Sequence, residues 1–165
     1  MNSEMNTMSR FVRYSSALMV LCASGCGGGA DAPQLAPVKG RVTVDGSEPF
    51  QEGLIRFIPA PGANLNSREA YTDADGNYTI VFSPGNPGLQ PGEYKVMFSL
   101  YKMPDGTDPP DQTQEADPKH PSQLGAVQLV PPEFELGKAA DCAVTVPEEG
   151  GTFDFDLPEL KPTKS

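Results

Sequence analysis

The sequence predicts an all-β protein, an antiparallel β-sandwich of about seven short strands, and three observations lead to that prediction. Glycine and proline are abundant, with 17 and 18 residues among 165, which favours turns over long helices. Apolar residues alternate with polar ones in short runs, the pattern of half-buried strands. Downstream of residue 30 we find no amphipathic helix of useful length. Short strands separated by turns are typical of two packed sheets.

Residues 1–25 have the organisation of a bacterial lipoprotein signal peptide. Two arginines precede residues 14–23, a short apolar segment of the length that export signals have. It is too short to span a bilayer, which needs about 20 residues. Ala23-Ser24-Gly25-Cys26 resembles a lipobox, although Ala23 stands where leucine is usual. We predict lipidation of Cys26 by palmitate or similar acyl chains; the alternative is an ordinary export signal with an incidental cysteine.

The translation start is open among Met1, Met5 and Met8, because a start at Met8 gives a more typical signal. Residues 26–36 are predicted to hold the lipidated cysteine and a flexible linker. The linker is expected because three glycines follow Cys26. Cys22 would leave with the signal, so Cys142 alone remains and no intramolecular disulfide is expected. We predict that Cys142 is a small apolar residue of the core.

The domain predicted over residues 37–158 opens with three strands. Residues 38–44 alternate with three valines on one face, and residues 53–58 place Ile55 and Phe57 inward. A short strand over residues 69–72 leads into a turn at residues 73–76.

Two longer alternating runs follow that turn. Residues 77–82 place Tyr78, Ile80 and Phe82 on one face, and residues 84–88 form a loop. The run over residues 93–101 is the longest, and its predicted inward residues are Tyr94, Val96, Phe98 and Leu100.

Residues 103–132 hold seven prolines and no periodicity, so they predict a mobile insert. Two strands close the domain, at residues 142–146 and 152–157, with alternate residues inward. The predicted inward residues of these strands are Cys142, Val144, Val146, Phe153, Phe155 and Leu157. Residues 159–165 are predicted to be a tail.

The order of several short motifs resembles a known family. The motifs are V-x-G-x-V-T-V-D-G, G-x-I-x-F-x-P, T-D-A-D-G-N-Y, P-G-E-Y-K-V, V-P-P-E-F and a closing F-D-F-D-L. Together they resemble the carboxypeptidase regulatory-like (transthyretin-like, prealbumin-type) domain over residues 37–157, and more narrowly the short planctomycete lipoproteins that carry it. The resemblance implies a prealbumin-type sandwich that serves as a non-catalytic accessory module.

Asp73 and Asp75 are weak candidates for a calcium site, because Asp-Ala-Asp-Gly suggests an EF-hand loop. Aligning Gly76 with the loop glycine puts Tyr71 and Phe82 at positions 1 and 12, and neither can supply a carboxylate. We therefore expect a hairpin turn, in which Gly76 has a positive φ and Asp73 or Asp75 accepts from nearby backbone. No metal or other cofactor is expected.

Four residues are expected to be structural rather than catalytic: Gly76, Tyr78, Gly92 and Tyr94. Pro91-Gly92-Glu93-Tyr94 resembles the tyrosine corner of sandwich folds, in which a tyrosine hydroxyl bonds to upstream backbone.

Charge and residue types exclude several functions. The net charge is −10, and residues 1–25 contribute +1 through two arginines and one glutamate, which leaves −11 for the remainder. Such a surface disfavours nucleic acid. His120 is the sole histidine, and no hydrolase or zinc motif occurs. The pairs Asp154/Asp156 and Glu148/Glu149 do not by themselves make a glycosidase, so we do not expect an enzyme.

These features predict a lipid-anchored, non-catalytic module of the cell envelope that faces the periplasm or exterior and has a binding or structural role. The alternatives are a surface-assembly subunit that pairs through an edge strand and a glycan-binding domain. Possible partners besides the membrane are an envelope protein or a glycan. The residues singled out for a partner surface near the insert are Tyr71, Met97, Tyr101 and Met103.

Overall fold

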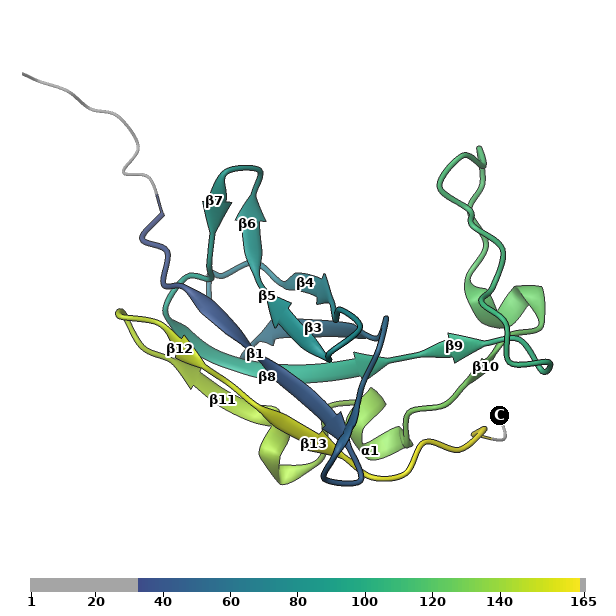
Figure 1. The fold of residues 1–165 in the computed structure, drawn as a ribbon. Helices are drawn as coiled ribbons and strands as arrows, with labels where there is room; N and C mark the ends of the chain where they lie inside the picture. Colours follow the sequence, from purple (N-terminus) through teal and green to yellow (C-terminus); the bar gives the residue numbers. More distant parts are fainter. Residues whose placement is uncertain (1–32, 164–165) are drawn as a thin grey trace, which may run out of the picture. The chain divides into compact units, whose positions relative to one another are not determined.

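The computed structural model describes residues 33–163, and this part of the chain is mostly β-strand with one short helix (Figure 1). The predicted signal peptide and Cys26 lie outside the described residues. The strands are β1 (Val38–Val44), β2 (Glu48–Pro49), β3 (Leu54–Pro59), β4 (Arg68–Tyr71), β5 (Asn77–Thr79), β6 (Val81–Ser83), β7 (Asn86–Pro87), β8 (Gly92–Ser99), β9 (Tyr101–Lys102), β10 (Val127–Gln128), β11 (Ala143–Val146), β12 (Gly151–Thr152) and β13 (Phe155–Leu157). The helix is α1 (Pro132–Glu135), and two 3-10 turns are η1 (Pro121–Leu124) and η2 (Ala140–Cys142). The all-β class is confirmed, and no helix among these residues is long and apolar enough to cross a membrane.

Two main sheets form the fold, and the one with the longer strands is called the larger sheet although it has four strands and the other has five. Its strand order is β11-β8-β3-β4, and every pair in it is antiparallel. Ile55 faces Phe98 and Phe57 faces Val96 across β3 and β8, and all four are buried. Side chains alternate between faces along a strand, so the intervening residues of β3, β4 and β8 form the outer face. That outer face becomes the floor of the candidate site.

The smaller sheet is built around β1. The strands β2 and β5 pair with β1 in the antiparallel sense, whereas β12 and β13 pair with it in parallel. The prediction of a wholly antiparallel sandwich was therefore wrong for the pairs that β1 makes with β12 and β13. After β11 the chain leaves the larger sheet through residues 147–150 and then runs in the same direction as β1 (Figure 1).

Aromatic contacts hold the two sheets face to face in a sandwich-like arrangement. The ring of Phe57 lies 6.1 Å from that of Tyr78, and the ring of Phe98 lies 5.1 Å from that of Phe155. Cys142 is fully buried, as predicted. The shared core therefore draws on both sheets.

The predicted strand over residues 77–82 is divided at Ile80. Its N–H still donates to Val38 O of β1, whereas its carbonyl accepts from Gly88 N, so the pairing with β1 ends at Ile80. Phe82 is only half-buried, contrary to the prediction. Instead of joining the core it lies under the Arg68 guanidinium, 4.1 Å from ring centroid to Cζ. Of the predicted loop at residues 84–88, residues 84–85 form the tip of the β6–β7 hairpin, whereas the prediction was wrong for Asn86 and Pro87, which form β7.

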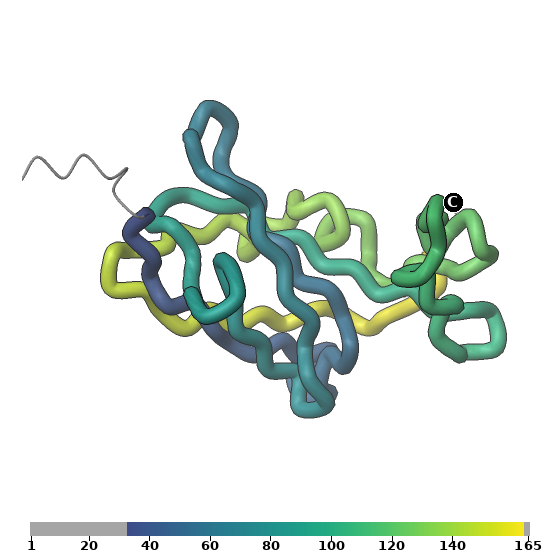
Figure 2. Tube along the Cα trace, turned by 90° about the horizontal axis from the view of Figure 1, so that it is seen from above, coloured from purple at the N-terminus to yellow at the C-terminus, as the bar shows by residue number. Residues whose placement is uncertain are grey.

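The insert over residues 103–132 carries more structure than its composition indicates. It contains η1 and β10, and β10 pairs with β9. Val130 is fully buried. The prediction that the insert has no strand or core residues was therefore wrong for its C-terminal end, while the mobility of the insert stays a prediction. The predicted tail runs back beside β10, where Thr163 N donates to Gln128 O (Figure 2).

Candidate functional site

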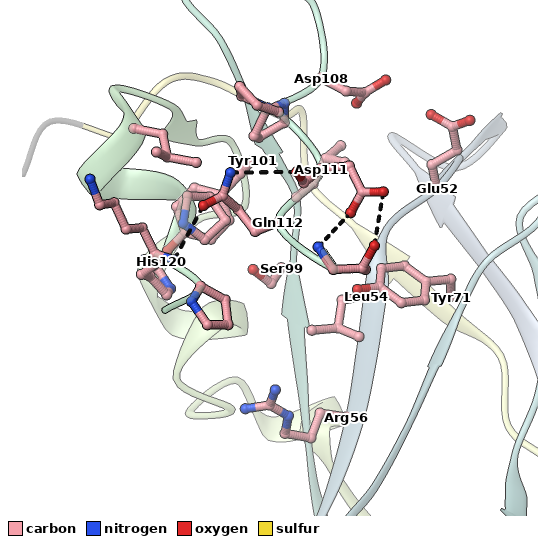
Figure 3. A pocket seen from close by; sticks show the side chains of 18 of the residues that line it. Glu52, Leu54, Arg56, Tyr71, Ser99, Tyr101, Asp108, Asp111, Gln112 and His120 are labelled. Atoms are coloured by element: carbon pink, nitrogen blue, oxygen red, sulfur yellow. Dashed lines mark hydrogen bonds between the residues drawn. The ribbon is translucent and has the colours of Figure 1, made fainter. Parts of the chain in front are cut away.

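A groove of about 790 Å³ lies between the outer face of the larger sheet and the insert (Figure 3). Its volume is within the range of small-molecule sites, about 300–1,000 Å³. The sheet contributes Leu54, Arg56, Tyr71, Met97 and Ser99, and the other principal lining residues are Glu52, Tyr101, Asp108, Asp111, Gln112, Lys119, His120, Leu124 and Glu135.

The floor of the groove consists of two cross-strand rows. Tyr71, Leu54 and Ser99 lie opposite one another on β4, β3 and β8. In the next row, the Arg56 guanidinium pairs with the Glu69 carboxylate at 2.8 Å. Tyr71 is 70 % exposed and does not belong to the core, so its ring is free to meet a ligand.

The wall of the groove is tied to the sheet by an ion-pair group. The Lys102 ammonium contacts the Asp108 carboxylate and lies 3.5 Å from Glu52. The hydrogen bond to Asp108, with the charges of both acids, raises the pKa of Lys102. Lys102 therefore stays protonated and holds the first part of the insert above the floor.

Asp111 shapes the next part of the wall by local hydrogen bonding. Its carboxylate accepts from Thr113 N at 2.8 Å and from Thr113 Oγ1 at 3.0 Å. These bonds lower the pKa of Asp111, because they favour the ionised form. The Gln112 amide makes only long contacts, 3.4 Å to Lys119 N and 3.5 Å to Asp111 O, so this side chain can turn to other partners.

Tyr101 and His120 close the far end, with an edge-on contact of 5.1 Å between ring centroids. Burial raises the pKa of Tyr101, and the charge of Glu135 adds to this. The His120 ring lies 2.8 Å from Ser122 Oγ and caps η1. His120 therefore stabilises the start of η1 within the insert.

Metal-binding groups do not converge in the described part of the chain. No group of three histidine, cysteine, aspartate or glutamate residues suited to a metal occurs among residues 33–163. Asp154 accepts from Arg41 N, and Asp156 accepts from Thr43 and Gly46. These two carboxylates bind backbone and side-chain groups of β1 and its turn, which gives them a structural role.

The Asp73–Gly76 turn is closed by its own residues. Asp73 Oδ1 accepts from Asp75 N at 2.9 Å and from Asn77 N at 2.8 Å, and the bond to Asn77 is the first cause of a lowered pKa of Asp73. Gly76 has φ 81°, the conformation that favours glycine. Of the two aspartates considered, Asp73 is the one that accepts the backbone hydrogen bonds.

Calcium should leave the thermal midpoint of the full-length protein unchanged. The Asp73 carboxylate is engaged by backbone N–H groups, and the turn lacks the further oxygen ligands that calcium needs, usually about 6–8. Differential scanning calorimetry with low millimolar calcium, against magnesium as control, measures this. A rise of several degrees with calcium alone would contradict the expectation.

Tyr94 makes the contact of a tyrosine corner. Its hydroxyl donates to Gln90 O at 2.8 Å, four residues upstream, and burial raises its pKa. Gly92 has φ 152°, and an added Cβ would lie 2.6 Å from Leu65 Cδ1. Tyr78 is a second structural tyrosine, because its hydroxyl donates to Phe153 O at 2.6 Å.

Tyr94→Phe should lower the free energy of unfolding by about 1 kcal/mol, the net contribution of a typical hydrogen bond. The substitution keeps the ring against Phe57 and removes only the bond to Gln90 O. Chemical denaturation measures the effect, with Tyr71→Phe as control on an exposed ring. An unchanged midpoint for Tyr94→Phe would exclude a stabilising corner.

The structure brings three of the four residues singled out for a partner surface to one groove. Tyr71, Met97 and Tyr101 line it, whereas Met103 lies in the turn before its wall. The sequence did not indicate Asp108, Asp111 or Gln112, because the insert has no periodicity to show which side chains turn inward.

Comparisons with known proteins assign this site to no family. No family model matches the chain, no curated protein matches it, and no solved structure matches it. The resemblance to the carboxypeptidase regulatory-like domain therefore stays a prediction.

Proposed function

We propose that this protein is a lipid-anchored, non-catalytic binding module of the cell envelope. Its domain is a prealbumin-type, carboxypeptidase regulatory-like sandwich with about seven principal strands. The lipid on Cys26 holds it to a membrane, and the linker that follows lets the domain face the periplasm or exterior.

The groove is the observation that carries the binding role. It combines a rigid sheet floor, an exposed tyrosine and a wall of polar side chains, the mixture of apolar surface and few placed polar groups that ligand sites have. Two carboxylates of the groove already have partners: Asp111 accepts local hydrogen bonds, and Asp108 forms an ion pair. This supports binding rather than acid–base chemistry.

Assembly through an edge strand is the second candidate, and β11 and β4 are the two edges of the sheet that forms the floor. Each has four residues, and Pro147 follows β11 directly. Short edges, and edges that end at proline, are poor templates for another chain, so the groove is the better supported route to a partner.

Two measurements test the proposal. Cys26→Ala should move the full chain from the membrane fraction to the aqueous fraction and abolish incorporation of labelled palmitate; retention with label would contradict the anchor. Hydrogen exchange of the detergent-solubilised protein, with and without envelope extract, should show protection at β4 and residues 108–121. Equal exchange with and without the extract would contradict the binding role.

A further inference from the structure

We propose that the groove binds an uncharged oligosaccharide. The inference rests on the proposed binding function, and it adds the chemical class of the ligand. It follows from three features of the groove: an exposed ring on a flat floor, acceptor groups above that floor, and an excess of negative charge.

The floor offers a stacking surface for a sugar ring. Tyr71 is 70 % exposed, and Leu54 lies directly opposite on β3. Figure 3 shows the two side chains next to each other. A pyranose ring has an apolar face of C–H groups, and such a face packs on the negative face of an aromatic ring. Because both residues stand on paired strands, this surface exists before any ligand arrives.

The wall offers acceptors for the hydroxyl groups on the rim of a sugar. Glu52, Asp108 and Asp111 present carboxylates above Tyr71 and Leu54 (Figure 3). Carboxylates accept from hydroxyls, and the Gln112 amide can both donate and accept. A ligand with one apolar face and a rim of hydroxyls matches this division between floor and wall.

The charge of the lining selects against anionic ligands. Four lining carboxylates, those of Glu52, Asp108, Asp111 and Glu135, face two lining cations. Lys102, which contacts Asp108 and Glu52, brings the cations to three. One of these cations, Arg56, is already paired with Glu69 at 2.8 Å. Uronates and sulfated or phosphorylated sugars would meet net repulsion, whereas a neutral chain would not.

The strand order argues against a peptide that extends the sheet. Most of the floor belongs to β3 and β8, which lie inside the order β11-β8-β3-β4 and have partners on both sides. Tyr71 stands on the edge strand β4, but a strand added to β4 would lie beside the floor and not on it. Peptides that add a strand need an unpaired sheet edge. A ligand that is recognised through its ring faces and hydroxyl groups does not need an unpaired sheet edge.

The test is isothermal titration of the full-length lipidated protein in detergent with cellohexaose, maltohexaose and chitohexaose, and with oligogalacturonate as the anionic comparison. At least one neutral hexasaccharide should bind, and oligogalacturonate should bind at least about tenfold more weakly because of the carboxylates. Tyr71→Ala should weaken binding about tenfold, and Tyr71→Phe should stay close to the wild type because the stacking ring remains.

The matched control is Val81→Ala, which removes an exposed apolar side chain of β6 outside the groove and should leave affinity unchanged. No binding of any neutral hexasaccharide, a preference for oligogalacturonate, or full affinity in Tyr71→Ala would each overturn the inference. If the groove is still protected by envelope extract in those cases, the binding role stands and only the ligand class fails. Protection abolished by protease treatment of the extract would identify a protein ligand and overturn the inference likewise.

Discussion

Replacing Gln128 by leucine is expected to lower the free energy of unfolding by about 2–4 kcal/mol, since two backbone N–H groups lose their acceptor and each such loss costs about 1–3 kcal/mol. Gln128 is 7 % exposed. Its Oε1 accepts from Leu100 N at 2.8 Å, Leu129 N at 3.1 Å and Val130 N at 3.2 Å. Leucine fills much of the same space and accepts none of these bonds, so Leu100 N and Val130 N lose their acceptor. Leu129 N keeps a second acceptor, Leu100 O at 2.9 Å. Urea denaturation measures the loss.

Hydrogen exchange localises the same effect. The amides of Leu100 and Val130 should exchange faster in Gln128→Leu, because their acceptor is gone, whereas Leu129 N keeps its bond to Leu100 O. Gln112→Leu is the matched control: it lies in the same insert, and its amide makes only contacts of 3.4 and 3.5 Å, so its stability should stay within about 0.5 kcal/mol of the wild type. Equal losses in the two variants would contradict a role for the Gln128 amide.

Gln128 shows why the insert was the least predictable part of the chain. Its amide substitutes for the ladder bonds that are missing where the chain breaks between β8 and β9 at Leu100. A polar residue between prolines carries no periodic signal, and its burial depends on partners about 28 positions away. Composition therefore indicated a loop, although the end of the insert, including Val130, is packed against the core.

Strands were predictable where alternation and burial coincide. In β1, β3 and β8 most of the alternate residues are buried by the opposite sheet, so the inward residues can be read from the sequence. The direction of β13 could not be read from the sequence, because alternating residues look the same in parallel and antiparallel pairs. Parallel pairing with β1 depends on where the chain crosses between sheets.

The candidate site was predictable in its floor and not in its wall. Tyr71, Met97 and Tyr101 are large side chains at outward positions of recognisable strands, which marks them as exposed. The place of Asp108 depends on an ion pair with Lys102, and that of His120 on its contact with Tyr101. Such contacts between loop side chains leave no pattern in one sequence.

Replacing Gly40 by alanine is expected to lower the free energy of unfolding by at least about 3 kcal/mol, at the upper end of overpacking effects. Gly40 lies in β1 opposite Tyr78. A Cβ there would lie 1.9 Å from Phe153 O and 2.9 Å from the Tyr78 hydroxyl. These two atoms form the 2.6 Å hydrogen bond that joins β5 to the segment between β12 and β13. One methyl group must therefore displace backbone and break that bond.

Gly151→Ala is the matched control for Gly40→Ala, because it adds the same methyl group to the same sheet. The nearest atom to its Cβ would be Phe153 Cε2 at 3.4 Å, an ordinary contact, so the change in stability should stay within about 0.5 kcal/mol. Tyr78→Phe/Gly40→Ala completes the comparison. If the lost hydrogen bond is part of the cost, the double variant should be less destabilised than the sum of the two single variants. A Gly40→Ala protein as stable as Gly151→Ala would show that β1 and its neighbours approach less closely than the structure indicates.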